Sequence, residues 1–300
     1  MQMQRASGLL THPTSLPSPY GIGDLGKGAY KFIDFMHQAG QKLWQILPLG
    51  PTGYGDSPYQ SFSTFAGNHY LISPDLLCEE GYLTVNDLED IPAFKSTSVD
   101  YGSVIEYKMN LYHKAFKAFQ INATPEQEQA YTKFCKQHKK WLYNYTLFVA
   151  VKEHFIEKRK MEKDTAAQDA FRTNNEKFLT KSQIKDYYYG AVWNSWPTDI
   201  AKGTKEAIIQ YQKLLAEEIR FHSFLQYEFF RQWDIVRKYA NKKGIKIIGD
   251  VPIFVAIDSS DVWAEPELFQ LDKLGNPKAV AGVPPDYFSE TGQLREFNQI

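Results

Sequence analysis

The 300-residue sequence predicts an α/β protein with parallel strands. Three short apolar runs, around Leu9, Ile46 and Ile247, have the pattern of short strands, and a helical pattern precedes each of the last two. Strand, helix, strand and then a long irregular loop is typical of an α/β barrel, in which loops after the strands carry the site. A complete barrel needs eight such units, so three strands predict only part of one, interrupted by a long helical insertion.

The first predicted strand covers residues 7–10. Three prolines within residues 12–20 exclude a helix or a central strand there. We expect a helix from Asp24 to Gly40, because its apolar residues recur at helical spacing and glycine commonly follows a helix end. Residues 43–47 then predict a second, buried strand that Pro48 stops.

Turn-forming residues dominate the next segment, residues 50–68, which predicts a long loop. From residue 103 to residue 243 the sequence is mostly helical in pattern. Within this region, residues 157–186 are highly charged and rich in Ala, Gln and Lys, which predicts a solvated helical insertion.

The last helix has the clearest pattern in the sequence. Its apolar residues are spaced by three or four along one face: Phe221, Leu225, Phe229, Trp233, Val236 and Ala240. Gly244 stands where a helix cap is expected, and residues 245–250 predict a buried parallel strand. Beyond Ala256 we expect loop and a short helix.

Composition excludes several classes of protein. The formal net charge is −1, so the chain has no overall cationic footprint for nucleic acid or anionic lipid. No apolar run is long enough to cross a membrane or to form a signal peptide, which predicts a cytoplasmic protein. Two cysteines, Cys78 and Cys135, cannot form a disulfide framework. Aromatic residues make up 15% of the chain, which indicates a large aromatic core or, for some rings, platforms for sugars.

One familiar motif is present without its context. Residues 21–26 match the dinucleotide fingerprint G-x-G-x-x-G, but prolines separate them from the preceding strand and no acidic residue ends the next one. A glycine turn before a helix explains the match. Four scattered histidines are expected to be structural or solvent-exposed: His12, His69, His154 and His222.

Two features suit a polar ligand. Asp250 is predicted at the carboxyl end of a strand, where barrel sites form, although it could instead cap the turn before Pro252. The segment 53–60 combines glycines with hydroxyl, amide and tyrosine side chains. Such a mixture binds sugar hydroxyls and C–H faces, and it is equally found in ordinary loops.

Five longer motifs resemble one family. They are LPSPYGIGD at 16–24, WQILPLGPT at 44–52, GDSPYQ at 55–60, IGDVPIFV at 248–255 and VAGVPPDYFS at 280–289. In order and spacing these motifs are similar to those of amylomaltase, the 4-α-glucanotransferase or disproportionating enzyme of glycoside hydrolase family 77. The resemblance spans residues 5–294, apart from the charged insertion.

The resemblance implies an α-amylase-type (β/α)₈ barrel with inserted subdomains, of which this chain would hold about the first three strands. It divides the chain into residues 1–75 with two strands and an active-site loop, a mostly helical subdomain at 76–215, and residues 216–300 with the third strand. It also implies transfer of α-1,4-glucan segments between maltodextrins by retaining double displacement, without metal or cofactor. The implied partners are maltooligosaccharides and glucans derived from starch or glycogen.

The resemblance also assigns site residues by position. Ser57 and Tyr59 resemble sugar-contacting residues of the active-site cleft, and Tyr54 resembles a ring near a second glucan-binding position. Asp250 matches the aspartate of the third strand that organises the site. Gln293 matches an acceptor-side residue on the loop that covers the cleft.

The sequence departs from the family in two ways. The family's cleft tryptophan, which follows Gly-Gln-Leu, is replaced by Arg295. The nucleophile aspartate and the acid/base glutamate are expected downstream of Ile300, and none of the nearby acidic residues matches them: Asp258, Asp261, Glu265 and Glu267. The chain is therefore expected to be a truncated glucanotransferase that is inactive alone. The alternatives are a non-catalytic glucan-binding fragment and a non-functional truncated product.

Overall fold

The structure is a computed structural model. It describes residues 5–52, 56–162, 165–176, 181–252, 255–279, 281–283, 285, 287 and 293–295. The chain forms two compact units, each assembled from three segments. Unit 1 comprises residues 1–59, 65–139 and 223–252, and unit 2 comprises residues 60–64, 140–222 and 253–300.

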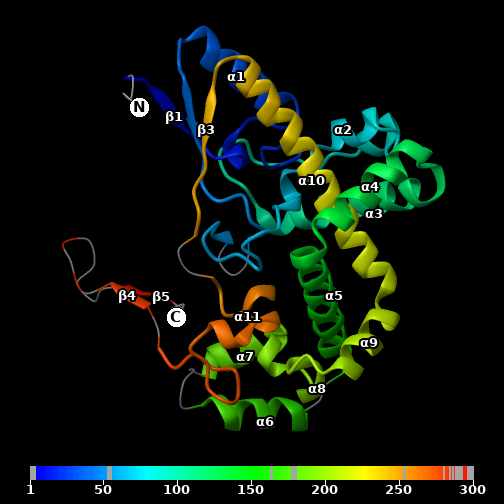
Figure 1. The fold of residues 1–300 in the computed structure, drawn as a ribbon, viewed down its shortest axis with the longest axis vertical. Helices are drawn as coiled ribbons and strands as arrows, with labels where there is room; N and C mark the ends of the chain where they lie inside the picture. The colour runs from blue at the N-terminus through cyan, green and yellow to red at the C-terminus, as the bar shows by residue number, and fades with distance from the viewer. Residues whose placement is uncertain are drawn as a thin grey trace. The chain divides into compact units, whose positions relative to one another are not determined.

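Unit 1 contains a three-stranded parallel sheet in the order β1-β2-β3 (Figure 1). The strands are β1 (Gly8–Leu10), β2 (Leu43–Gln45) and β3 (Lys246–Ile248). Gly8 is in register with Leu43, which is in register with Lys246. The three predicted strands and their parallel order are therefore confirmed, although β3 aligns with residues about 200 positions away in sequence.

The two faces of this sheet differ in burial. Trp44 is fully buried and its ring lies 5.4 Å from that of Phe32 on α1 (Lys27–Gln38). On the opposite face, Leu10 and Ile248 share one row and are 59% and 42% exposed. The prediction of buried strands is therefore wrong for one face, whose apolar side chains are left accessible by the residues that the structure describes.

Helix α1 begins three residues later than predicted. Asp24 does not open it; its buried carboxylate accepts hydrogen bonds from the Gly26 N–H and the Ser18 hydroxyl, both at 2.8 Å. The predicted end is confirmed, because Gly40 has a φ of +71° at the second position after the helix. The G-x-G-x-x-G match is a structural turn, as predicted: a Cβ on Gly23 would lie 2.1 Å from the Pro13 carbonyl oxygen.

The remaining helices of unit 1 pack around the later part of the longest helix, α10 (Ala216–Lys242). They are α2 (Pro74–Glu79), α3 (Tyr101–Asn122) and α4 (Pro125–Gln137), with short 3₁₀ turns at Pro13–Ser15, His69–Leu71 and Val85–Leu88. The first of these turns lies in the proline-rich segment where no helix was expected, since proline is tolerated at the first position of a turn. The α10 face carrying Phe229, Val236 and Ala240 is buried, as its spacing predicts.

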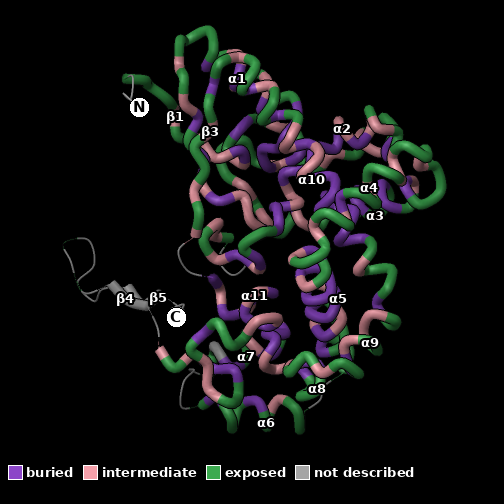
Figure 2. Tube along the Cα trace, viewed as in Figure 1, coloured by how far each residue is buried: buried purple, intermediate pink, exposed green. Residues whose placement is uncertain are grey.

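Unit 2 is largely helical. Its elements are α5 (Lys139–Met161), α6 (Thr165–Asn175), α7 (Lys181–Tyr189), a 3₁₀ turn at Trp193–Ser195, α8 (Thr198–Ala201), α9 (Lys205–Leu214), α11 (Ser260–Ala264) and a 3₁₀ turn at Pro266–Leu268. Figure 2 shows the buried stretch along α5. The predicted insertion at 157–186 is helical but not simply solvated, because Phe171 and Ile184 are buried together with Tyr188.

The C-terminal segment contains two strands that the sequence did not predict. Strands β4 (Ala281–Val283) and β5 (Gln293–Arg295) pair antiparallel, with Gly282 opposite Leu294. The expected short helix is present as α11. The two strands lack the alternation of apolar and polar residues that marks a strand, so no periodicity indicated them.

Candidate functional site

The site is built around a hydrogen bond between two residues that are far apart in the chain. The Tyr59 hydroxyl donates to the Asp250 carboxylate across 2.8 Å. Asp250 lies two residues beyond the end of β3, and Tyr59 lies in the long loop that follows β2. Since β2 and β3 are neighbouring parallel strands, their carboxyl ends bring these two segments together.

Ser57 belongs to the same group of residues. Its hydroxyl oxygen accepts a hydrogen bond from the Tyr59 backbone N–H at 3.3 Å, which orders the turn that presents the tyrosine. Ser57 and Asp250 are half-buried, and Tyr59 is 44% exposed. The group therefore offers a ring and a carboxylate to an incoming ligand.

The strand ends beneath this group are tied together. The Thr11 N–H donates to the Gln45 carbonyl and the Ile46 N–H donates to the Ile248 carbonyl, both at 3.0 Å. His12 follows β1, and its Nε2 lies 3.2 Å from the Pro48 carbonyl. Burial lowers the pKa of His12, so the ring stays neutral at pH 7 and acts as a structural tie, as predicted for this histidine.

The far end of the loop is held by α10. The Gly67 N–H donates to the Gln226 side-chain oxygen at 2.7 Å, and the Gln226 amide donates back to the Gly67 carbonyl at 2.9 Å. Both residues belong to unit 1, and Gln226 is buried. The sequence does not predict this clamp; its only signal is a glutamine on the apolar face of a strongly patterned helix.

The structure does not unite all five predicted residues. Tyr54 lies outside the described residues. Gln293 is the first residue of β5 and pairs with Val283, and the structure describes only its backbone. Ser57, Tyr59 and Asp250 are the predicted site residues that the structure brings together.

Two acidic residues that follow Asp250 have structural partners. The Lys152 ammonium forms a 2.5 Å ion pair with the Asp258 carboxylate. The Asp261 carboxylate accepts a hydrogen bond from the Thr64 N–H at 2.9 Å. Burial raises the pKa of both carboxyls, while Lys152 acts in the opposite direction on Asp258. Both carboxylates are thus engaged by unit 2 itself.

The chemistry of the Tyr59–Asp250 group is that of hydroxyl recognition. Because the carboxylate is an acceptor with about four lone-pair sites, Asp250 can take further hydrogen bonds from ligand hydroxyls after accepting one from Tyr59. The half-exposed Tyr59 ring adds an apolar surface.

Among the described residues there is no group of three or more His, Cys, Asp or Glu side chains suited to a metal ion. No described helix is both long and apolar enough to cross a membrane.

Comparisons with known proteins find relatives over nearly the whole chain. The profile of the 4-alpha-glucanotransferase family matches residues 11–298. The 4-alpha-glucanotransferase of Thermus thermophilus is 46% identical over 98% of this chain and 51% of its own length. The chloroplastic/amyloplastic 4-alpha-glucanotransferase of Solanum tuberosum is 35% identical over 97% of this chain and 45% of its own length.

A solved structure gives the same result. Amylomaltase from Streptococcus agalactiae in complex with acarbose matches with a TM-score of 0.83 and 39% identity, over 99% of this chain and 53% of that one. The chain spans about half the length of the curated relatives it matches. With nearly all of its residues inside the family profile, the chain belongs to the 4-alpha-glucanotransferase family.

Proposed function

We propose that this chain provides the glucan-recognition part of a 4-α-glucanotransferase, which transfers α-1,4-glucan segments between maltodextrins by retaining double displacement. The hydrogen bond from Tyr59 to Asp250 carries the proposal, because it joins two motifs that are 191 residues apart at the carboxyl ends of parallel strands. In this role Asp250 accepts hydrogen bonds from sugar hydroxyls, and the Tyr59 ring contacts a C–H face of the sugar.

The fold is part of the proposal. Strands β1, β2 and β3 are taken as the first three strands of an α-amylase-type (β/α)₈ barrel, with most of unit 2 as inserted helical structure. Their parallel order and the position of Asp250 beyond β3 support this. Barrel enzymes place their sites at this end of the strands.

The proposal divides recognition from chemistry. Retaining transfer needs a nucleophilic carboxylate and an acid/base carboxylate about 5–5.5 Å apart. The family positions that supply them have no counterpart among residues 1–300. The chain alone is therefore proposed to bind maltooligosaccharides without transferring glucose units, and Ser57, Tyr54 and Gln293 are proposed as additional sugar contacts.

A hybrid enzyme tests the proposal. Residues 1–300 replace the matching segment of the Thermus thermophilus 4-alpha-glucanotransferase, and glucose release from maltotriose is measured. We expect the hybrid to transfer glucose units and Tyr59→Ala to lower its kcat/KM about 5- to 150-fold, the equivalent of about 1–3 kcal/mol for a lost aromatic and hydrogen-bonding contact.

Tyr59→Phe separates the two contributions of the tyrosine. It keeps the ring and removes the bond to Asp250, so its kcat/KM should fall between those of the parent hybrid and Tyr59→Ala. Tyr189→Phe, which removes a hydroxyl from α7 in unit 2, serves as the matched control and should change nothing. An active hybrid whose kcat/KM is unaffected by Tyr59→Ala would refute the assignment.

A further inference from the structure

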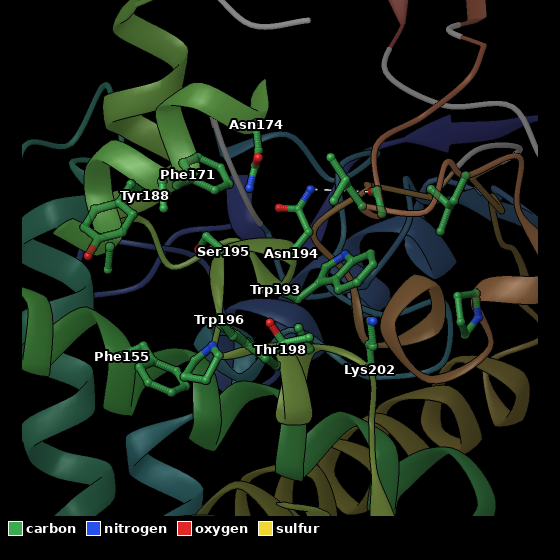
Figure 3. Close-up of a pocket in the computed structure, with 18 of the residues that line it drawn as sticks. Phe155, Phe171, Asn174, Tyr188, Trp193, Asn194, Ser195, Trp196, Thr198 and Lys202 are labelled. Carbon is green, nitrogen blue, oxygen red and sulfur yellow. Dashed lines mark hydrogen bonds between the residues drawn. The ribbon is translucent and has the colours of Figure 1, made fainter. Parts of the chain in front are cut away.

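Unit 2 contains a cavity of about 800 Å³ that none of the five predicted site residues lines. It lies among α5, α6, α7, the segment from Trp193 to Lys202 and the turn from Pro266 to Gly275 (Figure 3). All of these residues belong to unit 2. The volume falls in the range of about 300–1,000 Å³ that small-molecule sites occupy.

Aromatic side chains form much of its wall. They are Phe155, Phe171, Tyr188, Trp193, Trp196 and Phe269. The polar ends of the two tryptophans are already used: the Trp193 indole N–H donates to the Ile257 carbonyl and the Trp196 indole N–H to the Ala191 carbonyl, both at 2.8 Å. The indoles therefore have only ring carbon to offer a ligand in the cavity.

Two charged groups of the wall already have partners within the protein. The Arg159 guanidinium donates to the Ser195 hydroxyl at 2.8 Å and lies 4.1 Å from the centre of the Tyr188 ring. The Asp272 carboxylate accepts from the Leu274 and Asn276 N–H groups at 2.8 Å. The other charged lining residues are of both signs: Lys158, Lys202, Lys273, Glu162 and Glu267. This near balance gives no field that would select an anion or a cation.

One buried polar atom in the wall has no hydrogen-bond partner among the described residues. The Asn194 amide nitrogen donates to the Asn276 side-chain oxygen at 3.1 Å, whereas its Oδ1 is buried and has no hydrogen-bond partner among the described residues. Buried acceptors are normally satisfied, so an unpaired one in a cavity wall is suited to a ligand hydroxyl. Figure 3 shows the Asn194 oxygen turned toward the side of the cavity where Asn174 lies.

We infer that this cavity is a second binding site, which takes a neutral carbohydrate of one to three pyranose rings. Sugars combine apolar C–H faces, which stack on aromatic rings, with hydroxyls that donate to a neutral amide oxygen. Charged ligands fit less well, because the cations and anions of the wall are paired or balanced. The inference goes beyond the proposed function, since the site shares no residue with the Tyr59–Asp250 group.

The test uses the full chain with Tyr59→Ala, so that binding at the first site is weakened. Maltotriose binding is measured by isothermal titration calorimetry. Ala170 is exposed and lines the cavity from α6, so Ala170→Trp fills the space with little effect on folding. We expect the Tyr59→Ala chain to bind maltotriose and the added Ala170→Trp to weaken binding about tenfold or more.

Ala166→Trp is the matched control, because Ala166 is an exposed alanine of the same helix that does not line the cavity. It should leave the affinity unchanged. Should Ala170→Trp unfold the chain, as judged by its melting curve, Ala167→Trp fills the cavity from the neighbouring turn. The inference is overturned if the Tyr59→Ala chain does not bind maltotriose, if filling the cavity leaves binding unchanged, or if adenosine binds there and maltotriose does not. None of these outcomes depends on the transferase assay of the hybrid, which tests the proposed function separately.

Discussion

Lys108 shows how a single buried charge holds part of the fold. It is fully buried on α3, and its ammonium donates to the carbonyls of Tyr70 and Ile72 at 2.7 and 3.1 Å. Burial lowers its pKa to about 8, and the negative charge of Asp24 opposes this change. These bonds fix the turn that follows the long loop, so the lysine connects helix packing to the loop carrying Tyr59.

We predict that Lys108→Met destabilises the chain by about 2–4 kcal/mol at pH 7, because two buried carbonyls lose their donor. The loss of unfolding free energy caused by Lys108→Met should become larger above pH 8. Between pH 8 and the ordinary lysine pKa of 10.5, the unfolded chain holds a proton that the folded chain has released, so the stability of the parent rises with pH relative to the variant. Urea unfolding at pH 7, 8.5 and 10 measures both effects.

The control is Lys114→Met, because Lys114 lies on the same helix with an exposed side chain that pairs with Asp87. Its exposed ion pair should contribute less than about 1 kcal/mol. If the difference in the free energy of unfolding between the parent and Lys108→Met became smaller from pH 8 to pH 10, that result would contradict the assigned direction of the pKa change.

At the scale of elements, α10 is the support on which the long loop rests. Gly67 lies so close to this helix that a Cβ would come within 1.9 Å of the Phe229 ring. The clamp from Gln226 requires this approach, since both of its hydrogen bonds reach the Gly67 backbone. Only a residue without a side chain allows the loop to sit here.

Gly67→Ala should therefore destabilise the chain by about 1–3 kcal/mol or more, the cost of overpacking a rigid core. Gly102→Ala is the matched control, because Gly102 lies in α3 with only one atom near the added Cβ, at 3.5 Å. It should stabilise the chain by up to about 1 kcal/mol, since alanine favours helix. Thermal melting of the two variants decides the matter, and equal melting temperatures would disprove the close-packing argument.

The elements that could be predicted from sequence are those with local signals. The spacing along α10, Gly244 after it and the apolar runs of β1, β2 and β3 all lie within short windows, and all appear in the structure. The resemblance to a family drew attention to Ser57, Tyr59 and Asp250, and the structure shows how they meet.

The features that could not be predicted from sequence depend on contacts between distant parts of the chain. The delayed start of α1 follows from the buried carboxylate of Asp24, and the position of Gly67 follows from a helix about 160 residues later. The cavity of unit 2 arises where five separate segments meet. Strands β4 and β5 carry no alternation of apolar and polar residues. No window of sequence contains this information.

On the scale of the whole molecule, the sheet has one uncovered apolar row. Leu10 and Ile248 are exposed on the same face, with Gln45 between them in register. Exposed apolar side chains on a sheet favour self-association. We therefore expect this row to contribute to self-association of the chain.

Replacing both residues, Leu10→Thr with Ile248→Thr, should reduce binding of the dye ANS and raise the soluble fraction. Threonine keeps the preference for strand geometry, so the melting temperature should change little. The control is Ile121→Thr, because Ile121 is 80% exposed at the end of α3 and lies outside the sheet. If the double variant binds as much ANS as the parent, the exposed row is not the source of self-association.

The pairing of β2 with β3 also determines when the sheet can be completed during synthesis. Strand β2 leaves the ribosome about 35 residues after β1, whereas β3, which pairs with β2, is made about 200 residues later. At about 5–20 residues per second this delay is about 10–40 s. Limited proteolysis of chains arrested before and after β3 emerges should show β2 becoming protected only in the longer ones. During that interval one edge of β2 in the nascent chain has no partner strand. The helices between β2 and β3 are therefore expected to fold before the three-stranded sheet is complete.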